Sequence, residues 1–175
     1  MSTYLQPRPE VGEPAPWSFP VAERFTLDNG LAVSLYERPG QHVVSVGLSL
    51  DLPLASEPRA SEGVAGVMAD TLDQGTRSHP GESFADALER SGGAFDTSSG
   101  FSATQLFLDV PATHLAEALP LLGEAVMEPQ LTDADVARVR GILAAQLQQQ
   151  RANGSARADL ETRAALIESS FRASR

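Results

Sequence analysis

The chain lacks cysteine altogether, so it can form neither a disulfide framework nor a thiolate metal site. Its only three histidines, His42, His79 and His114, lie far apart and match no metal-ligand spacing. No apolar run approaches the roughly 20 residues that a membrane-spanning helix needs. We therefore expect no disulfide, no histidine-based metal site and no membrane span.

Positive charge is also scarce, since the 175 residues carry a net charge of −10. Such a balance disfavours nucleic acid and anionic membrane surfaces, because both attract Lys and Arg. The segment from Met1 to Pro20 has neither the basic and apolar regions of a signal peptide nor the low acidity of a transit peptide. We expect a cytoplasmic protein without a nucleic-acid or membrane partner.

The hydrophobic content of 42% is enough for one core. Five prolines in the first twenty residues predict an extended arm over residues 1–23, because proline fixes φ and has no amide hydrogen. The rest, residues 24–175, reads as a single lobe.

Strands and helices alternate in groups along this lobe. A β-hairpin is expected at 24–36, around the turn Asp28-Asn29-Gly30, and a strand with one buried face at 44–50. Ser61 and Glu62 are expected to open a helix that Gly75 ends. Further helices are expected after Pro80 and near 112–127, 132–152 and 156–172, and strands at 93–98 and 103–110. This order predicts the α+β class.

One stretch, Gly63 to Thr76, resembles the zinc-binding helix of the pitrilysin/insulinase-like (M16) metallopeptidases, whose pattern is close to G-x-A-H-x-x-E-H-x-x-x-x-G-T. Further segments resemble the same family in the same order: the opening hairpin at 25–33, Ser91 to Thr97, and Val110-Pro111 with the later Glu128-Pro129-Gln130-Leu131. Together they cover roughly residues 24 to 172. The resemblance implies a lobe with helices packed on a mixed, mainly antiparallel sheet.

The chemical groups of the family are replaced in this chain. The resemblance places the two zinc histidines on Gly66 and Asp70, the general-base glutamate on Ala69, and the third ligand, a glutamate of a later helix, on Gln146. Zinc in a catalytic site needs three good protein ligands and an open position for water. We therefore expect no zinc, no other cofactor and no catalytic residue, although active relatives hold zinc.

Asp70 and Asp73 stand one helical turn apart and offer another possibility, a carboxylate pair for a hard cation. Solvated carboxylates on a helix face are far more common.

The chain stops at Arg175 without the further strands that complete a lobe of the family, and a complete subunit adds a second lobe. We expect an N-terminal portion with an incomplete sheet, whose unpaired edge favours association.

In active relatives the substrate adds as a β-strand to an edge strand, which the resemblance places at Ala94, Phe95, Asp96, Thr97, Ser98 and Ser99. We expect a non-catalytic subunit that supports or regulates an active M16 partner, as a heterodimer, and holds extended peptide. One alternative is a structural or assembly subunit of the same fold. Another is a metalloendopeptidase with an unusual metal site.

Overall fold

The computed structural model describes residues 12–14 and 16–166. Contacts divide the chain into two units, residues 1–41 and 42–175. In the first unit, strands β1 (Glu23–Thr26) and β2 (Ala32–Leu35) pair antiparallel. Gly30 adopts φ 87° in the connecting turn, which explains the glycine there. The predicted hairpin is confirmed.

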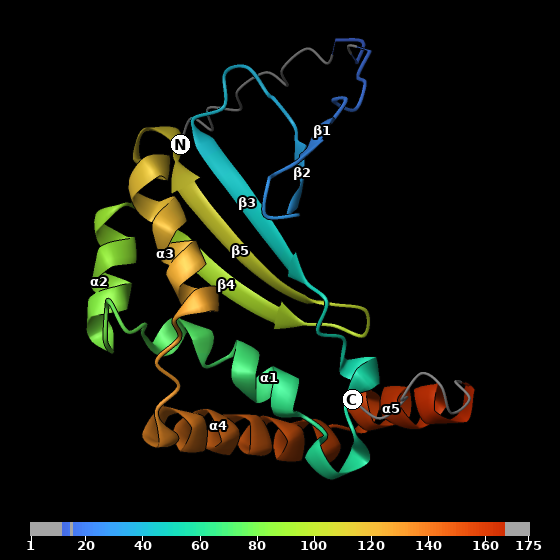
Figure 1. Cartoon of the computed structure of the whole chain (residues 1–175). Coiled ribbons are helices and arrows are strands. Elements are labelled where there is room, and N and C mark those ends of the chain that lie inside the picture. Colours follow the sequence, from blue (N-terminus) through green and yellow to red (C-terminus); the bar gives the residue numbers. More distant parts are fainter. Residues whose placement is uncertain (1–11, 15, 167–175) are drawn as a thin grey trace, which may run out of the picture. The chain divides into compact units, whose positions relative to one another are not determined.

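The second unit contains a three-stranded antiparallel sheet in the order β3-β5-β4 (Figure 1). Its strands are β3 (Val43–Leu50), β4 (Ala94–Ser99) and β5 (Thr104–Pro111). Since β5 lies in the middle, β4 is an edge strand of this sheet. The predicted α+β class is confirmed, and every strand pair within the described residues is antiparallel.

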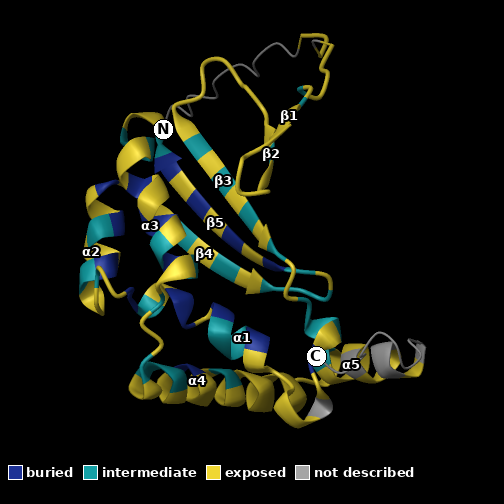
Figure 2. Cartoon of the chain, viewed as in Figure 1, coloured by how far each residue is buried: buried dark blue, intermediate teal, exposed yellow. Residues whose placement is uncertain are grey.

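Alternating side chains give the sheet one buried and one exposed face. Along β5, Leu106, Leu108 and Val110 are buried, whereas the residues between them are exposed (Figure 2). The buried face packs against α2 (Glu82–Arg90) and α3 (Leu115–Met127). Phe84 of α2 meets Phe95 of β4 edge to face, with ring centroids 5.9 Å apart.

Two further helices follow in the same unit, α4 (Asp133–Ala152) and α5 (Gly154–Leu166). Of Thr132 and Asp133, which the sequence offers as alternative caps, Thr132 caps α4 by accepting a hydrogen bond from the Asp135 amide at 3.1 Å. The predicted helix at 156–172 begins earlier, and its last six residues lie outside the described part. None of the described helices combines the length and hydropathy of a membrane span.

The helix of the degenerate motif, α1 (Val64–Ala69), is shorter than the sequence predicts. Neither Ser61 nor Glu62 caps it. The buried carboxylate of Glu57 does so instead, because its two oxygens accept the amides of Gly63 at 2.9 Å and Ala65 at 2.6 Å. A carboxylate there satisfies amides that the first helical turn leaves without partners.

A tight turn after α1 anchors that end of the motif. The Glu124 carboxylate of α3 accepts the Thr76 hydroxyl at 2.9 Å and lies 2.8 Å from Nδ1 of His79. Gly75 adopts φ 131°, and a Cβ atom there would lie 2.4 Å from the amide nitrogen of Gly81. Only glycine fits this backbone and this close approach.

We therefore predict that Gly75→Ala lowers the free energy of unfolding by about 3 kcal/mol, through the positive φ and the backbone clash. Gly66→Ala is the matched control, because a Cβ at Gly66 meets nothing within 4 Å. Alanine favours the helix, so the control should gain up to about 1 kcal/mol. Urea unfolding of both variants measures the difference, and equal midpoints would contradict the expected role of Gly75.

Candidate functional site

Helix α1 lies between strand β4 and helix α4 and contacts both (Figure 1). Two hydroxyl groups of β4 attach it to the sheet. Thr97 donates to the carbonyl of Ala69 and Ser99 donates to the carbonyl of Ala65, each at 3.0 Å. The edge strand and the degenerate helix are therefore directly joined.

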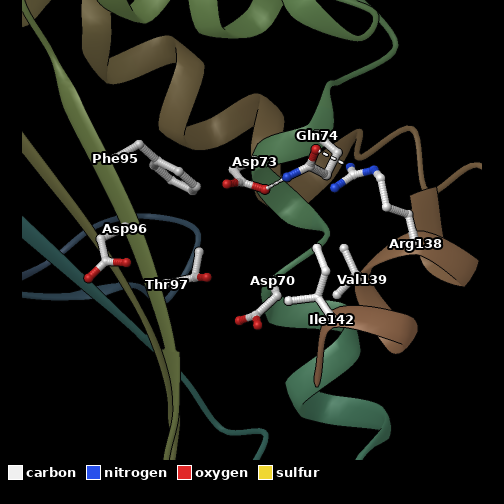
Figure 3. A pocket seen from close by; sticks show the side chains of 9 residues that line it. All are labelled: Asp70, Asp73, Gln74, Phe95, Asp96, Thr97, Arg138, Val139 and Ile142. Carbon is white, nitrogen blue, oxygen red and sulfur yellow. Dashed lines mark hydrogen bonds between the residues drawn. The ribbon is translucent and has the colours of Figure 1, made fainter. Parts of the chain in front are cut away.

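The three motif positions of α1 differ in their surroundings. Gly66 borders open space, so a side chain would fit there. Ala69 is fully buried, so a glutamate in its place would require its neighbours to shift. Asp70 ends the helix with its carboxylate beside β4 and α4 (Figure 3).

Gln146, the fourth motif position, lies on α4 and is exposed. It stands two helical turns after Val139 and about one turn after Ile142, which places all three on the same side of the helix. The structure thus brings α4 against α1 as the motif requires, although Gln146 does not line the pocket described below.

These four residues do not fit zinc. Gly66 and Ala69 have no donor atom, Asp70 supplies one carboxylate, and a neutral amide such as that of Gln146 is a poor zinc ligand. Among residues 12–14 and 16–166, no three His, Asp or Glu side chains are grouped so that they could hold a metal ion.

A pocket of about 270 Å³ opens at this place. Strand β4 contributes Phe95 and Thr97, which point toward Asp70 and Asp73 (Figure 3). Helix α4 closes the other side with Val139, Ile142 and Arg138. The pocket thus has apolar walls and carboxylates within it.

Among the described residues that line the pocket, Arg138 is the only cation, and other groups engage it. Its guanidinium donates to the side-chain amide oxygen Oε1 of Gln74 and, at 3.3 Å, to the Asp135 carboxylate. Hydrogen bonds from Thr132 and Arg138 lower the pKa of Asp135. Gln74 in turn donates to Asp73. The guanidinium charge is therefore directed at Asp135 rather than at Asp70.

The pKa of Asp70 reflects this surplus of carboxylates. Burial raises it above the ordinary 3.8, and the negative charges of Asp73 and Asp96 raise it further. No hydrogen bond from another described residue reaches its carboxylate. Asp70 consequently carries its charge at a cost to the folded state.

The alternation of hydrogen bonds in the sheet determines which backbone groups of β4 point outward, away from β5. In an antiparallel pair, residues that exchange both backbone hydrogen bonds alternate with residues that exchange none. The amide of Ala112 donates to the carbonyl of His42 at 2.8 Å, just before the pair Val43–Pro111. That next pair must be non-bonded, which agrees with the missing amide hydrogen of Pro111.

Between β4 and β5, the bonded residues of β5 are those that are not bonded to β3. The amide of Gly100 donates to the carbonyl of Ala103 at 2.9 Å, so Ser98, Asp96 and Ala94 use their backbone groups toward β5. The amides and carbonyls that point away from β5 are those of Phe95, Thr97 and Ser99. Within the described residues, no backbone hydrogen bond to another segment satisfies them.

Sequence reasoning identified the strand 94–99 and Asp70 but missed Arg138, Val139 and Ile142. A signal for two of them was available, since Val139 and Ile142 precede Gln146 by seven and four residues. Those spacings put them on the same helix face.

We predict that Asp70→Asn stabilises the fold at pH 7. Because the pKa of Asp70 is raised, the folded state binds more protons than the unfolded state between pH 3.8 and the folded pKa. The cost of the charge therefore builds up across that interval and is fully present above the folded pKa. Below pH 3.8 the carboxyl is neutral in both states and the gain should vanish. Thermal unfolding at pH 7 and pH 3 tests this, with Asp86→Asn on the exposed side of α2 as control. A gain that persists at pH 3 would refute the electrostatic cause.

Comparison with known proteins places this arrangement in a family. The family model for insulinase (peptidase family M16) matches residues 32–172. The coenzyme PQQ synthesis protein F of Pseudomonas syringae pv. tomato is 30% identical over 154 residues, which are 87% of this chain and 20% of that protein. Human mitochondrial cytochrome b-c1 complex subunit 1 is 25% identical over 134 residues, which are 77% of this chain and 28% of that protein.

Among solved structures, the M16 inactive domain from Pseudomonas fluorescens superimposes with a TM-score of 0.80 at 20% identity, covering 88% of this chain and 38% of that one. That similarity concerns the fold. The chain spans about a fifth of the length of the PQQ relative. With the family model matching most of its residues, the chain belongs to the M16 peptidase family.

Proposed function

We propose that this chain is a non-catalytic M16 subunit that holds extended peptide along β4 and supports or regulates an active zinc peptidase partner. The proposal rests on a contrast between the replaced metal ligands and the open edge of β4. The residues at the metal positions, Gly66, Asp70 and Gln146, offer zinc at most one carboxylate, whereas no other strand among residues 12–14 and 16–166 pairs with the outer edge of β4.

Peptide recognition by strand addition uses main-chain hydrogen bonds, which do not depend on the side chains of the receiving strand. Replacing the zinc ligands therefore removes hydrolysis without removing binding. The partner is proposed because a subunit without its own zinc contributes to proteolysis only beside one that has it. The name of the Pseudomonas fluorescens relative, an inactive M16 domain, supports a role of this kind.

A second candidate is a structural or assembly subunit without a peptide role. The similarity to cytochrome b-c1 complex subunit 1 favours it, since that relative is by its name a subunit of a larger complex. Peptide binding separates the two candidates.

The first test concerns zinc. We expect the full chain, purified without chelator, to contain less than one zinc per chain. The variant Gly66→His/Asp70→His/Gln146→Glu should take up zinc, because it restores three ligands on helices that already contact each other. Ala69 is left unchanged, since it is fully buried and the general base is not a ligand.

Elemental analysis measures both, with Gly66→His/Asp70→His as the incomplete control. Stoichiometric zinc in the wild type that is lost in Asp70→Ala would sink the non-catalytic assignment. A folded triple variant with no more zinc than the wild type would mean that the register of α1 or of Gln146 is wrong.

The second test concerns the edge strand. An unstructured peptide should slow amide exchange in residues 94–99 of the wild type. Thr97→Pro should abolish this protection, because it removes an outward amide while leaving the β4–β5 ladder intact. Thr97→Val is the control: it loses the hydroxyl bond to Ala69 but keeps the amide.

Exchange measured by mass spectrometry on the full chain decides the outcome. If both substitutions abolish protection alike, the hydroxyl bond and not the outward amide is responsible. A folded wild type without peptide-dependent protection at 94–99 favours the structural candidate.

A further inference from the structure

The pocket beside β4 has room for a long side chain. Its volume of about 270 Å³ lies below the range of about 300–1,000 Å³ that is usual for pockets that enclose small molecules. It is bounded by the edge strand on one side, so a chain paired with that strand would pass directly along it.

The phase of the sheet determines which peptide residue would face the pocket. A peptide residue paired with Thr97 bonds to the outward groups of that residue, and directly paired residues have side chains on the same face. Phe95 and Thr97 point into the pocket. Asp96 also borders it, with its side chain on the opposite face of the strand (Figure 3). The side chain opposite Thr97 therefore enters the pocket, and its two neighbours project to the open face.

The chemistry of the walls selects among side chains. Phe95, Val139 and Ile142 offer apolar surface for an aliphatic stem. Asp70 and Asp73 offer negative charge, and the guanidinium of Arg138 is held by Asp135 and Gln74. A long apolar stem with a cationic end matches both requirements, because such side chains bury the stem and leave the charge near polar groups.

We infer that the pocket takes the side chain of a lysine or arginine in the peptide residue paired with Thr97, so that the peptides held by this chain are basic at that position. The inference rests on the proposed peptide role of β4 and adds its specificity. The position once given to a metal in the family's pattern thus serves a cationic side chain of the peptide.

Affinity is tested with the full chain and three synthetic peptides that are identical except at one central position, which holds lysine, norleucine or glutamate. Norleucine keeps the aliphatic stem without the charge. We expect lysine to bind about fivefold more tightly than norleucine, and glutamate more weakly than both. Asp70→Asn and Asp73→Asn should each reduce the preference for lysine, whereas Asp109→Asn, on the open face of β5, should leave it unchanged.

Cross-linking locates the side chain. The chain contains no lysine, so a carbodiimide that joins amines to carboxylates has no lysine of the protein as a competitor. The lysine of the peptide should be joined to Asp70 or Asp73 and not to Asp109.

The outcomes distinguish the specificity of the pocket from the peptide role of β4. Peptides that protect residues 94–99 but bind equally with lysine, norleucine and glutamate would overturn the pocket inference and leave the peptide role intact. The same holds if the cross-link falls on Asp109. If none of the peptides protects residues 94–99, both the peptide role and the pocket inference fail.

Discussion

Two hydroxyl groups, those of Thr97 and Ser99, connect helix α1 to strand β4, and the geometry of the candidate site depends on that connection. Side chains must make this connection, because the backbone groups of a helix bond to one another and cannot pair with a strand. The Glu57 carboxylate fixes the beginning of the same helix. With α1 held in this way, Asp70 lies beside Phe95 and Thr97, and α4 completes the enclosure.

The sequence predicted the repetitive part of this arrangement well. Alternating residues indicated β3 and β5, the Asn-Gly turn indicated the hairpin, and helical spacing indicated α2, α3 and α4. It failed at the start of α1, where nearby Ser61 and Glu62 were better local caps than Glu57. Glu57 is competent only because the intervening turns bring it back to the helix. A contact of that kind depends on tertiary structure and leaves no local pattern.

The sequence did not predict the pocket for a related reason. It unites residues at the end of α1 and in the turn after it with residues of β4 and α4, and no periodicity within one element encodes their meeting. The register of the edge was also hidden, since it depends on hydrogen bonds at both ends of β5. What the sequence did carry was the loss of donor atoms at Gly66 and Ala69, because a missing side chain is visible without coordinates.

The exposure of α4 affects which substitutions this protein can accept during evolution. Only Val139 of that helix is fully enclosed, and the rest of it lies largely in solvent (Figure 2). Substitutions at Arg138 or Ile142 alter the wall of the pocket without opening a cavity in the core, so they cost little stability. The sheet and α1 tolerate far less variation. The lining of the pocket can therefore change through one face of α4 while the fold stays constant.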